Sequence, residues 1–388
     1  MHFALGLAVG VLLSASPAGR PVLIGLDLEF GHETSTSDDA IKQGTLLAVE
    51  EINFRGGVLG GRPLAVVERD NRSNPARGVE NVQALAALPD LVAVLGGKFS
   101  PVYLQELPVV HEKELILLDP WGAADAIVDN GYRPSFVFRL SLKDSWAVRA
   151  LLDGAHRRGL DRVGLLLPTT AWGRSCERAA LERAPRAPAV QLAGTEWYSW
   201  GERTLLPKYR ALRAAGAQAI LLVANEVEGS LLVRELAALP PSERLPVLSH
   251  WGITGGDFAT LCGPALGEVD LSVVQTFSFL GRRSARAAAV LEALHRVFGV
   301  AGPEAVASPV GLAHAYDLVH ILARAIDLAG TTDRRKVRDA LERARFGEGL
   351  VRRYDQPFTA GRHEALRPED VFLARWDARG VLVPLPRP

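Results

Sequence analysis

Short apolar runs alternate with amphipathic stretches along almost the whole chain, and this alternation restricts the fold more than any other feature of the sequence. The apolar run at 22–28 (VLIGLDL) is followed at 39–53 by apolar residues at helical spacing, and glycines at 56–61 then interrupt the pattern. Strand, helix and turn in this order are typical of βαβ units, which build mostly parallel sheets covered by helices. We therefore predict an α/β fold.

The alternation forms two successive series. In the first, the expected strands lie at 22–28, 64–70, 91–97 and 115–120, with helices at 39–53 and 76–88. In the second, the expected strands lie at 163–168, 189–197, 219–225, 246–251 and 271–277, with helices at 173–183, 205–215 and 228–239. Two similar series predict two doubly wound, Rossmann-like lobes, which also suits a chain of 388 residues because one core rarely serves so many.

Three further helices are expected after the second series, at 284–298, 310–329 and 334–343. They need a sheet to cover, and a return of the chain to the first lobe would supply one.

The first 20 residues resemble a signal peptide. An apolar stretch at 3–13 is followed by Ser16-Pro17-Ala18, which resembles a cleavage site, although only His2 stands where a basic residue is usual. We expect export to the periplasm. The two cysteines, Cys176 and Cys262, lie far from this end, so no lipid anchor through an N-terminal cysteine is expected. We favour two buried thiols, but the sequence leaves open whether Cys176 and Cys262 form a disulfide.

Charge and motifs exclude several function classes. Lys+Arg and Asp+Glu both total 44 with no long run of one sign, so a nucleic-acid partner is not expected. The chain has no GxGxxG after its first strand, no GxxxxGK[ST], no HExxH and no GxSxG. We therefore predict a protein that is not an enzyme and has no cofactor and no catalytic metal.

Several segments, taken in order, resemble the type I periplasmic binding proteins, specifically the leucine/isoleucine/valine-binding family of branched-chain amino-acid ABC transporters. The segments that carry the resemblance are AVEEIN (48–53), GGVLGGRP (56–63), ERDNRSNP (68–75), FVFRLSLKD (136–144), AWG (171–173) and AILLVAN (219–225).

The resemblance implies two lobes joined by three hinge crossovers, with a small-molecule ligand between them. We expect lobe 1 to comprise 21–140 and 274–350, and lobe 2 to comprise 141–273 and 351–388. In open α/β sheets, ligands bind beyond the carboxyl ends of the strands, where helix N-termini offer free N–H groups. The candidate site residues are therefore those that follow the expected strands.

In the first lobe the candidates are Ser100, Trp121, Gly122 and Ala123. Ser100 precedes a proline and could cap a helix, while the resemblance implies that it holds a ligand carboxylate. Residues 121–123 stand where the family commonly has Gly-Ala-Thr, so the threonine hydroxyl is missing and the backbone or Lys98 would have to replace it. Trp121 could instead simply fill the lobe.

In the second lobe the candidates are Trp146, Trp172, Asn225 and Trp251. The resemblance implies that Trp172 stacks on the ligand in place of a tyrosine, with core packing as the alternative. For Trp146, a position away from the cleft is the favoured alternative. Asn225 and Trp251 end two strands at which the family commonly has an aromatic residue and a carboxylate.

The tryptophan at 251 leaves the α-ammonium of an amino acid without its family partner, and an unpaired buried charge is costly. Either Glu226 or Glu29 supplies the missing charge, or the ligand carries no ammonium. A pocket with Trp121, Trp172 and Trp251 would suit an aromatic acid by stacking or an alkylated cation by cation–π attraction. We favour a ligand other than a standard branched-chain amino acid.

The sequence thus predicts an extracytoplasmic, monomeric solute-binding protein of an ABC importer, with an ABC permease in the membrane as its partner. Two alternatives remain open: a ligand-sensing receptor of the same fold, and an enzyme on a doubly wound scaffold.

Overall fold

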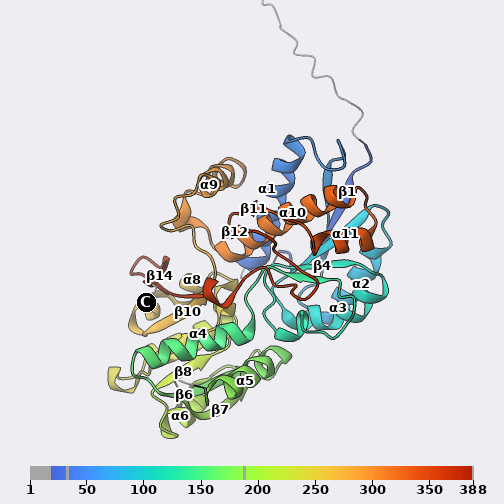
Figure 1. Cartoon of the computed structure of the whole chain (residues 1–388). Coiled ribbons are helices and arrows are strands. Elements are labelled where there is room, and N and C mark those ends of the chain that lie inside the picture. The colour runs from blue at the N-terminus through green and yellow to red at the C-terminus, as the bar shows by residue number, and fades with distance from the viewer. Residues whose placement is uncertain (1–18, 32–34, 187–188, 387–388) are drawn as a thin grey trace, which may run out of the picture.

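The computed structural model describes residues 19–31, 35–186 and 189–386 and has two α/β lobes (Figure 1). The predicted signal peptide lies almost wholly outside these residues. The predicted α/β class with two doubly wound lobes is confirmed by the sheets. The sheet of the first lobe is parallel throughout, in the order β2-β1-β3-β4-β5. Its strands are β1 (Val22–Leu28), β2 (Leu64–Asp70), β3 (Leu91–Gly96), β4 (Ile116–Asp119) and β5 (Val137–Arg139).

The sheet of the second lobe has the order β14-β13-β10-β9-β8-β6-β7. Its first five strands, in the order β7-β6-β8-β9-β10, repeat the arrangement of the first sheet, and β13 and β14 then add antiparallel strands beside β10. The strands are β6 (Arg162–Pro168), β7 (Gln191–Tyr198), β8 (Ala219–Leu222), β9 (Val247–Ser249), β10 (Leu271–Gln275), β13 (Phe372–Trp376) and β14 (Leu382–Pro384). A separate hairpin consists of β11 (Gly347–Glu348) and β12 (Arg353–Tyr354).

Helices cover both faces of the parallel strands, and for this reason β3, β4 and β8 are buried along their full length, and all their residues except Asp119 at the end of β4 are apolar. The helices of the first series are α1 (Thr36–Phe54), α2 (Pro75–Ala86) and α3 (Ser100–Glu112). Those of the second lobe are α4 (Asp144–Arg157), α5 (Ala171–Arg183), α6 (Leu206–Ala214), α7 (Glu226–Ala237) and α8 (Phe258–Cys262).

The chain then returns to the first lobe, where the three helices that follow the second series find a sheet to cover. The returning helices are α9 (Ala285–Phe298), α10 (Pro309–Ala329) and α11 (Arg334–Leu341). Helix α10 packs along α1 and is buried on nearly every side, and α11 reaches β3. In Figure 1 these orange helices lie against the blue and cyan elements of the first lobe.

Within the described residues the chain passes between the lobes three times, after β5, after β10 and before β13. A buried ion pair joins the first and third passages, because the Arg139 guanidinium makes two hydrogen bonds with Glu364, of 2.9 and 2.6 Å. Phe358 and His363 also contact β5 through Phe138, so this part of the C-terminal segment lies beside the first sheet. The lobe boundaries expected from the sequence stay a prediction.

Two details differ from the sequence expectations. Helix α3 is capped by Phe99, so the interpretation of Ser100 as the N-cap is wrong, and Ser100 is the first helical residue. The short strands β5, β13 and β14 were not anticipated.

Cys176 and Cys262 are both buried free thiols. Among the described residues, no helix combines the length and apolar character needed to span a bilayer.

Candidate ligand-binding cleft

The carboxyl ends of both sheets meet at the boundary between the lobes, and matching strands bring matching residues together. Lys98 and Ser100 follow β3, while Asn225 and Glu226 follow β8, the equivalent strand of the other lobe. In both sheets the strand order reverses next to this point, which is where open α/β sheets bind ligands.

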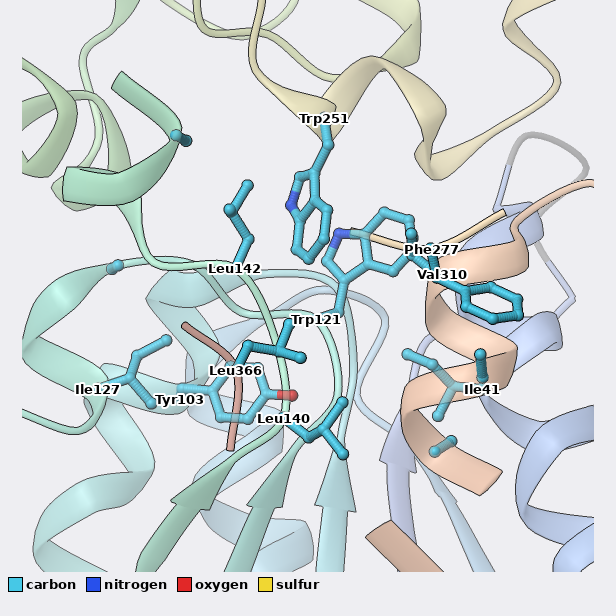
Figure 2. Packing of buried hydrophobic residues seen from close by; sticks show 14 of the residues in the cluster. Ile41, Tyr103, Trp121, Ile127, Leu140, Leu142, Trp251, Phe277, Val310 and Leu366 are labelled. Atoms are coloured by element: carbon cyan, nitrogen blue, oxygen red, sulfur yellow. The ribbon is translucent and has the colours of Figure 1, made fainter. Parts of the chain in front are cut away.

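Two tryptophans stack across the boundary. Trp121 follows β4, and Trp251 follows the equivalent strand β9, in a 3₁₀ turn at Trp251–Gly255. Their ring centroids lie 5.1 Å apart at an interplanar angle of 29°, and both side chains are almost fully buried. Figure 2 shows Trp251 projecting from the second-lobe backbone onto Trp121. An offset stack of this kind is attractive and contributes to holding the lobes together.

Lys98 forms a second link across the boundary. Its Nζ lies 3.3 Å from Oε2 of Glu29 in its own lobe and 3.2 Å from Oε1 of Glu226 in the other lobe. Burial acts to lower the pKa of Lys98, but the nearby carboxylates of Glu226, Asp38 and Glu29 outweigh burial and raise it. Lys98 is therefore a buried ammonium that both lobes neutralise.

Asp38 completes this charged group from the first turn of α1. Its Oδ2 accepts a 2.8 Å hydrogen bond from the backbone N–H of Glu29. Burial raises the pKa of Asp38 to about 7, against the opposing effect of Lys98. One oxygen of Asp38 and one of Glu226, Oε2, have no hydrogen-bond partner in the described structure. Glu29 and Glu226 together carry one charge more than Lys98 neutralises.

Ser100 lies next to a loop that the hinge holds in place. Its hydroxyl oxygen accepts hydrogen bonds of 3.2 Å from the backbone N–H groups of Ala123 and Ala124. The buried Arg139 donates to the carbonyl oxygens of Gly122 (3.2 Å) and Ala124 (2.9 Å). The ion pair with Glu364 therefore connects the hinge passages to the loop that carries three of the predicted site residues.

Trp172 is held in the second lobe by its backbone and by its indole. Thr170 caps α5 by accepting from the N–H of Gly173, which places Trp172 in the first turn. The indole Nε1–H donates to Oδ1 of Asp144 at 3.1 Å. The ring packs so closely on Gly252 that a Cβ there would lie 2.4 Å from it.

These side chains leave only a small space between the lobes. The cavity measures about 20 Å³, enough for about one water molecule, because packed aromatic rings fill most of the gap between the strand tips. The tryptophans thus face the boundary, but the lobes are closed on each other, and a ligand can enter only after they separate. The cavity is lined by Lys98, Phe99, Ser100, Pro101, Trp121, Ala123, Trp172, Trp200, Asn225, Trp251 and Gly252.

Six of the eight residues proposed from the sequence meet here: Ser100, Trp121, Ala123, Trp172, Asn225 and Trp251. Their binding role stays a prediction. Gly122 does not line the cavity, since a Cβ at this position would point at Tyr103 and Ile127. The placement of Trp146 in the cleft is wrong, because it lines a separate groove between α4 and the C-terminal segment that contains β13.

The sequence did not identify Phe99 or Trp200, whose rings meet edge to face across the boundary at 5.6 Å. Their positions at strand ends could have identified them, since Trp200 comes two residues after β7 and Phe99 three residues after β3.

A family model described as periplasmic binding protein matches residues 21–380. The Leu/Ile/Val-binding protein homolog 1 of Brucella suis is 22% identical over 341 residues, 87% of this chain and 86% of the relative. The homolog 3 of Brucella melitensis is 22% identical over 248 residues, 62% of this chain and 66% of its own length, just under two thirds.

Solved structures show the same fold. A type 1 periplasmic binding protein from Bordetella pertussis superposes with a TM-score of 0.84 at 20% identity, covering 95% of this chain and all (100%) of that one. An ABC transporter solute-binding protein from R. palustris in complex with benzoate superposes with a TM-score of 0.74 at 17% identity. The match covers 94% of this chain and 95% of that one.

Proposed function

The chain belongs to the periplasmic binding protein family, and on that basis we propose that it is the extracytoplasmic solute-binding component of an ABC importer and binds a small aromatic carboxylate that has no ammonium group. The family consists of binding proteins rather than enzymes. Proteins of this family are extracytoplasmic, and a periplasmic location for this chain is part of the proposal.

One observation supports the ligand class most strongly. The ammonium of Lys98 already lies between Glu29 and Glu226, the carboxylates that the sequence offered as partners for an amino acid's ammonium. A ligand ammonium at this position would have to share these carboxylates with the Lys98 ammonium, and two cations this close repel each other. A ligand without an ammonium leaves the group intact.

The rest of the cleft suits a flat acid. Helix α3 starts at Ser100, and the positive dipole end of a helix N-terminus favours a carboxylate. The stacked rings of Trp121 and Trp251 offer two aromatic faces from opposite lobes. We propose that the aromatic ring of the ligand separates this stack and lies between the two indoles, with its carboxylate toward Ser100.

Ligand binding of this kind drives closure. A solute between Trp121 and Trp251 contacts both lobes only in the closed state, so it shifts the open–closed equilibrium by its differential affinity. The three chain passages act as the hinge, and the closed form docks on the membrane permease as a monomer.

Matched ligands test the proposal. 3-Phenylpropanoate and L-phenylalanine differ only by the α-ammonium, and benzoate and L-leucine extend the comparison. In titration calorimetry we expect the two acids without ammonium to bind at least tenfold more tightly than the two amino acids. Equal or tighter binding of the amino acids, or no binding of any of the four, would overturn the proposed ligand class.

The transport role needs a separate measurement. Cells that lack the gene should lose uptake of the radiolabelled acid and regain it with the wild-type gene. Unchanged uptake by the deletion strain would point to a sensing receptor of the same fold.

A further inference from the structure

Three buried side chains with different donor atoms meet behind Trp172. Asp144 is the first residue of α4, Cys176 lies in α5, and His250 follows β9. One carboxylate oxygen, the Sγ and one ring nitrogen all lie within 4.8 Å of one another. None of the three side chains is more than 1% exposed.

The donor atoms of this cluster are poorly satisfied. Oδ2 of Asp144 and both ring nitrogens of His250 have no hydrogen-bond partner among the described residues. Nε2 of His250 lies 3.1 Å from Oδ1 of Asp144 but without the geometry of a hydrogen bond. In the described part of the chain this is the only contact between Asp144 and a basic side chain, and it is an ion pair only when His250 is protonated. A buried carboxylate is costly unless a cation pairs with it.

We propose that Asp144, Cys176 and His250 form a binding site for one divalent transition metal ion, with Zn²⁺ as the best fit. Sulfur, imidazole nitrogen and carboxylate oxygen are the ligands that Zn²⁺ takes, whereas Mg²⁺ and Ca²⁺ select oxygen. In a tetrahedral site with bonds of about 2.0–2.3 Å, the ligand atoms lie about 3.3–3.6 Å apart. The carboxylate and imidazole, 3.1 Å apart, are already close to this spacing, and all three donor atoms lie within 4.8 Å of one another, so side-chain movements are enough to close the site.

The charges balance when the metal binds. The buried Cys176 is a free thiol, and cysteine binds a metal as the thiolate. A divalent ion therefore displaces the thiol proton to solvent and forms a metal–thiolate bond. The two positive charges of the metal then offset the thiolate and the Asp144 carboxylate, and the buried site is neutral.

Metal binding would also act on the cleft through Trp172. Its indole N–H donates to Asp144, and its ring meets the ring of His250 edge to face at 5.0 Å. A metal that fixes both partners also fixes Trp172. This coupling rests on the proposed function, whereas the metal site itself does not.

The test uses the purified protein after removal of metals with EDTA. We expect Co²⁺ to bind with one equivalent per chain and to give the near-ultraviolet thiolate-to-cobalt charge-transfer band, and Zn²⁺ to displace it while releasing about one proton per chain. C176S should abolish the band and weaken Co²⁺ binding at least ~100-fold, since even outer-shell partners are worth about 10–100-fold. H250Q should weaken binding similarly.

Cys262, the other buried thiol, provides the matched control, and C262S should keep the band and the affinity. A wild-type protein that binds no Co²⁺ or gives no band overturns the proposal, whether or not the variants fold. An unchanged band and affinity in C176S also overturn it. The metal titration is done without organic ligand, so a failed ligand screen leaves its result intact.

Discussion

Replacement of Lys98 by methionine should destabilise the closed state and change which ligands bind. The substitution keeps an unbranched, apolar side chain but removes the ammonium that lies 3.3 Å from Glu29 and 3.2 Å from Glu226. Removal of one partner from a buried ion pair typically costs about 3–5 kcal/mol, because the other charge stays buried and unpaired. Lobe opening exposes Glu226 to water, so most of this cost should fall on the closed state.

An amino acid can restore the missing charge in this variant. The ammonium of L-phenylalanine can take the position of the Lys98 ammonium, while 3-phenylpropanoate cannot. If the ligand recovers about 2 kcal/mol of the lost pairing energy, its relative affinity rises by about 30-fold. We therefore expect calorimetry to show the ratio of the two dissociation constants shifted by about 30-fold toward the amino acid.

Lys42→Met is the matched control. Lys42 pairs with Glu68 at 2.7 Å, but its side chain is 33% exposed, and a surface pair of this kind is worth about 0–1 kcal/mol. Lys42→Met should leave the ratio of the dissociation constants of L-phenylalanine and 3-phenylpropanoate unchanged. The same ratio in Lys98→Met and in the wild type would refute the assignment of Lys98 as a substitute for the ligand ammonium.

Two further changes test packing and buried charge. Gly252→Ala should weaken ligand binding at least tenfold and lower the free energy of unfolding by about 1–3 kcal/mol, because its Cβ would lie 2.4 Å from the Trp172 ring. Gly267→Ala is the control, since its Cβ would have open space. Calorimetry and chemical denaturation should show no change in ligand affinity or stability for this control. Burial and the nearby Asp27 raise the pKa of Glu106 well above its usual value, so the folded state keeps a proton that the unfolded chain releases. Stability should therefore fall as pH rises from the unfolded pKa of 4.5 toward the folded one. Urea denaturation between about pH 5 and pH 8 should give a flatter pH profile for Glu106→Gln, and an unchanged profile would contradict this.

The sequence predicted the parallel core of both lobes because buried parallel strands are continuous apolar runs between amphipathic helices. It missed β13 and β14, since these short antiparallel strands are only partly buried and no helix separates them. It missed β5 because three residues carry too little pattern.

For the site, the rule that ligands bind at strand ends was enough to select six of the cavity-lining residues. It also selected Gly122, which does not line the cavity. Trp146 was chosen because it lies near the start of a helix, and it is two residues after the buried Asp144 on α4. Successive helical residues are about 100° apart, so Trp146 faces away from the side on which Asp144 lies.

The contact between Lys98 and Glu226 depends on how the lobes meet. The two residues are 128 positions apart in different lobes, and their pairing follows only from the facing of equivalent strand ends. The cluster of Asp144, Cys176 and His250 is equally invisible in the sequence, because its members come from three separate elements.

Hydrogen–deuterium exchange with and without saturating 3-phenylpropanoate tests the central claim most directly. If the strand ends of both lobes hold one solute, amides near Ser100 and Ala123 and amides near Trp172 and Trp251 should become protected together. Protection confined to one lobe, or at neither set of strand ends, would contradict ligand binding in this cleft.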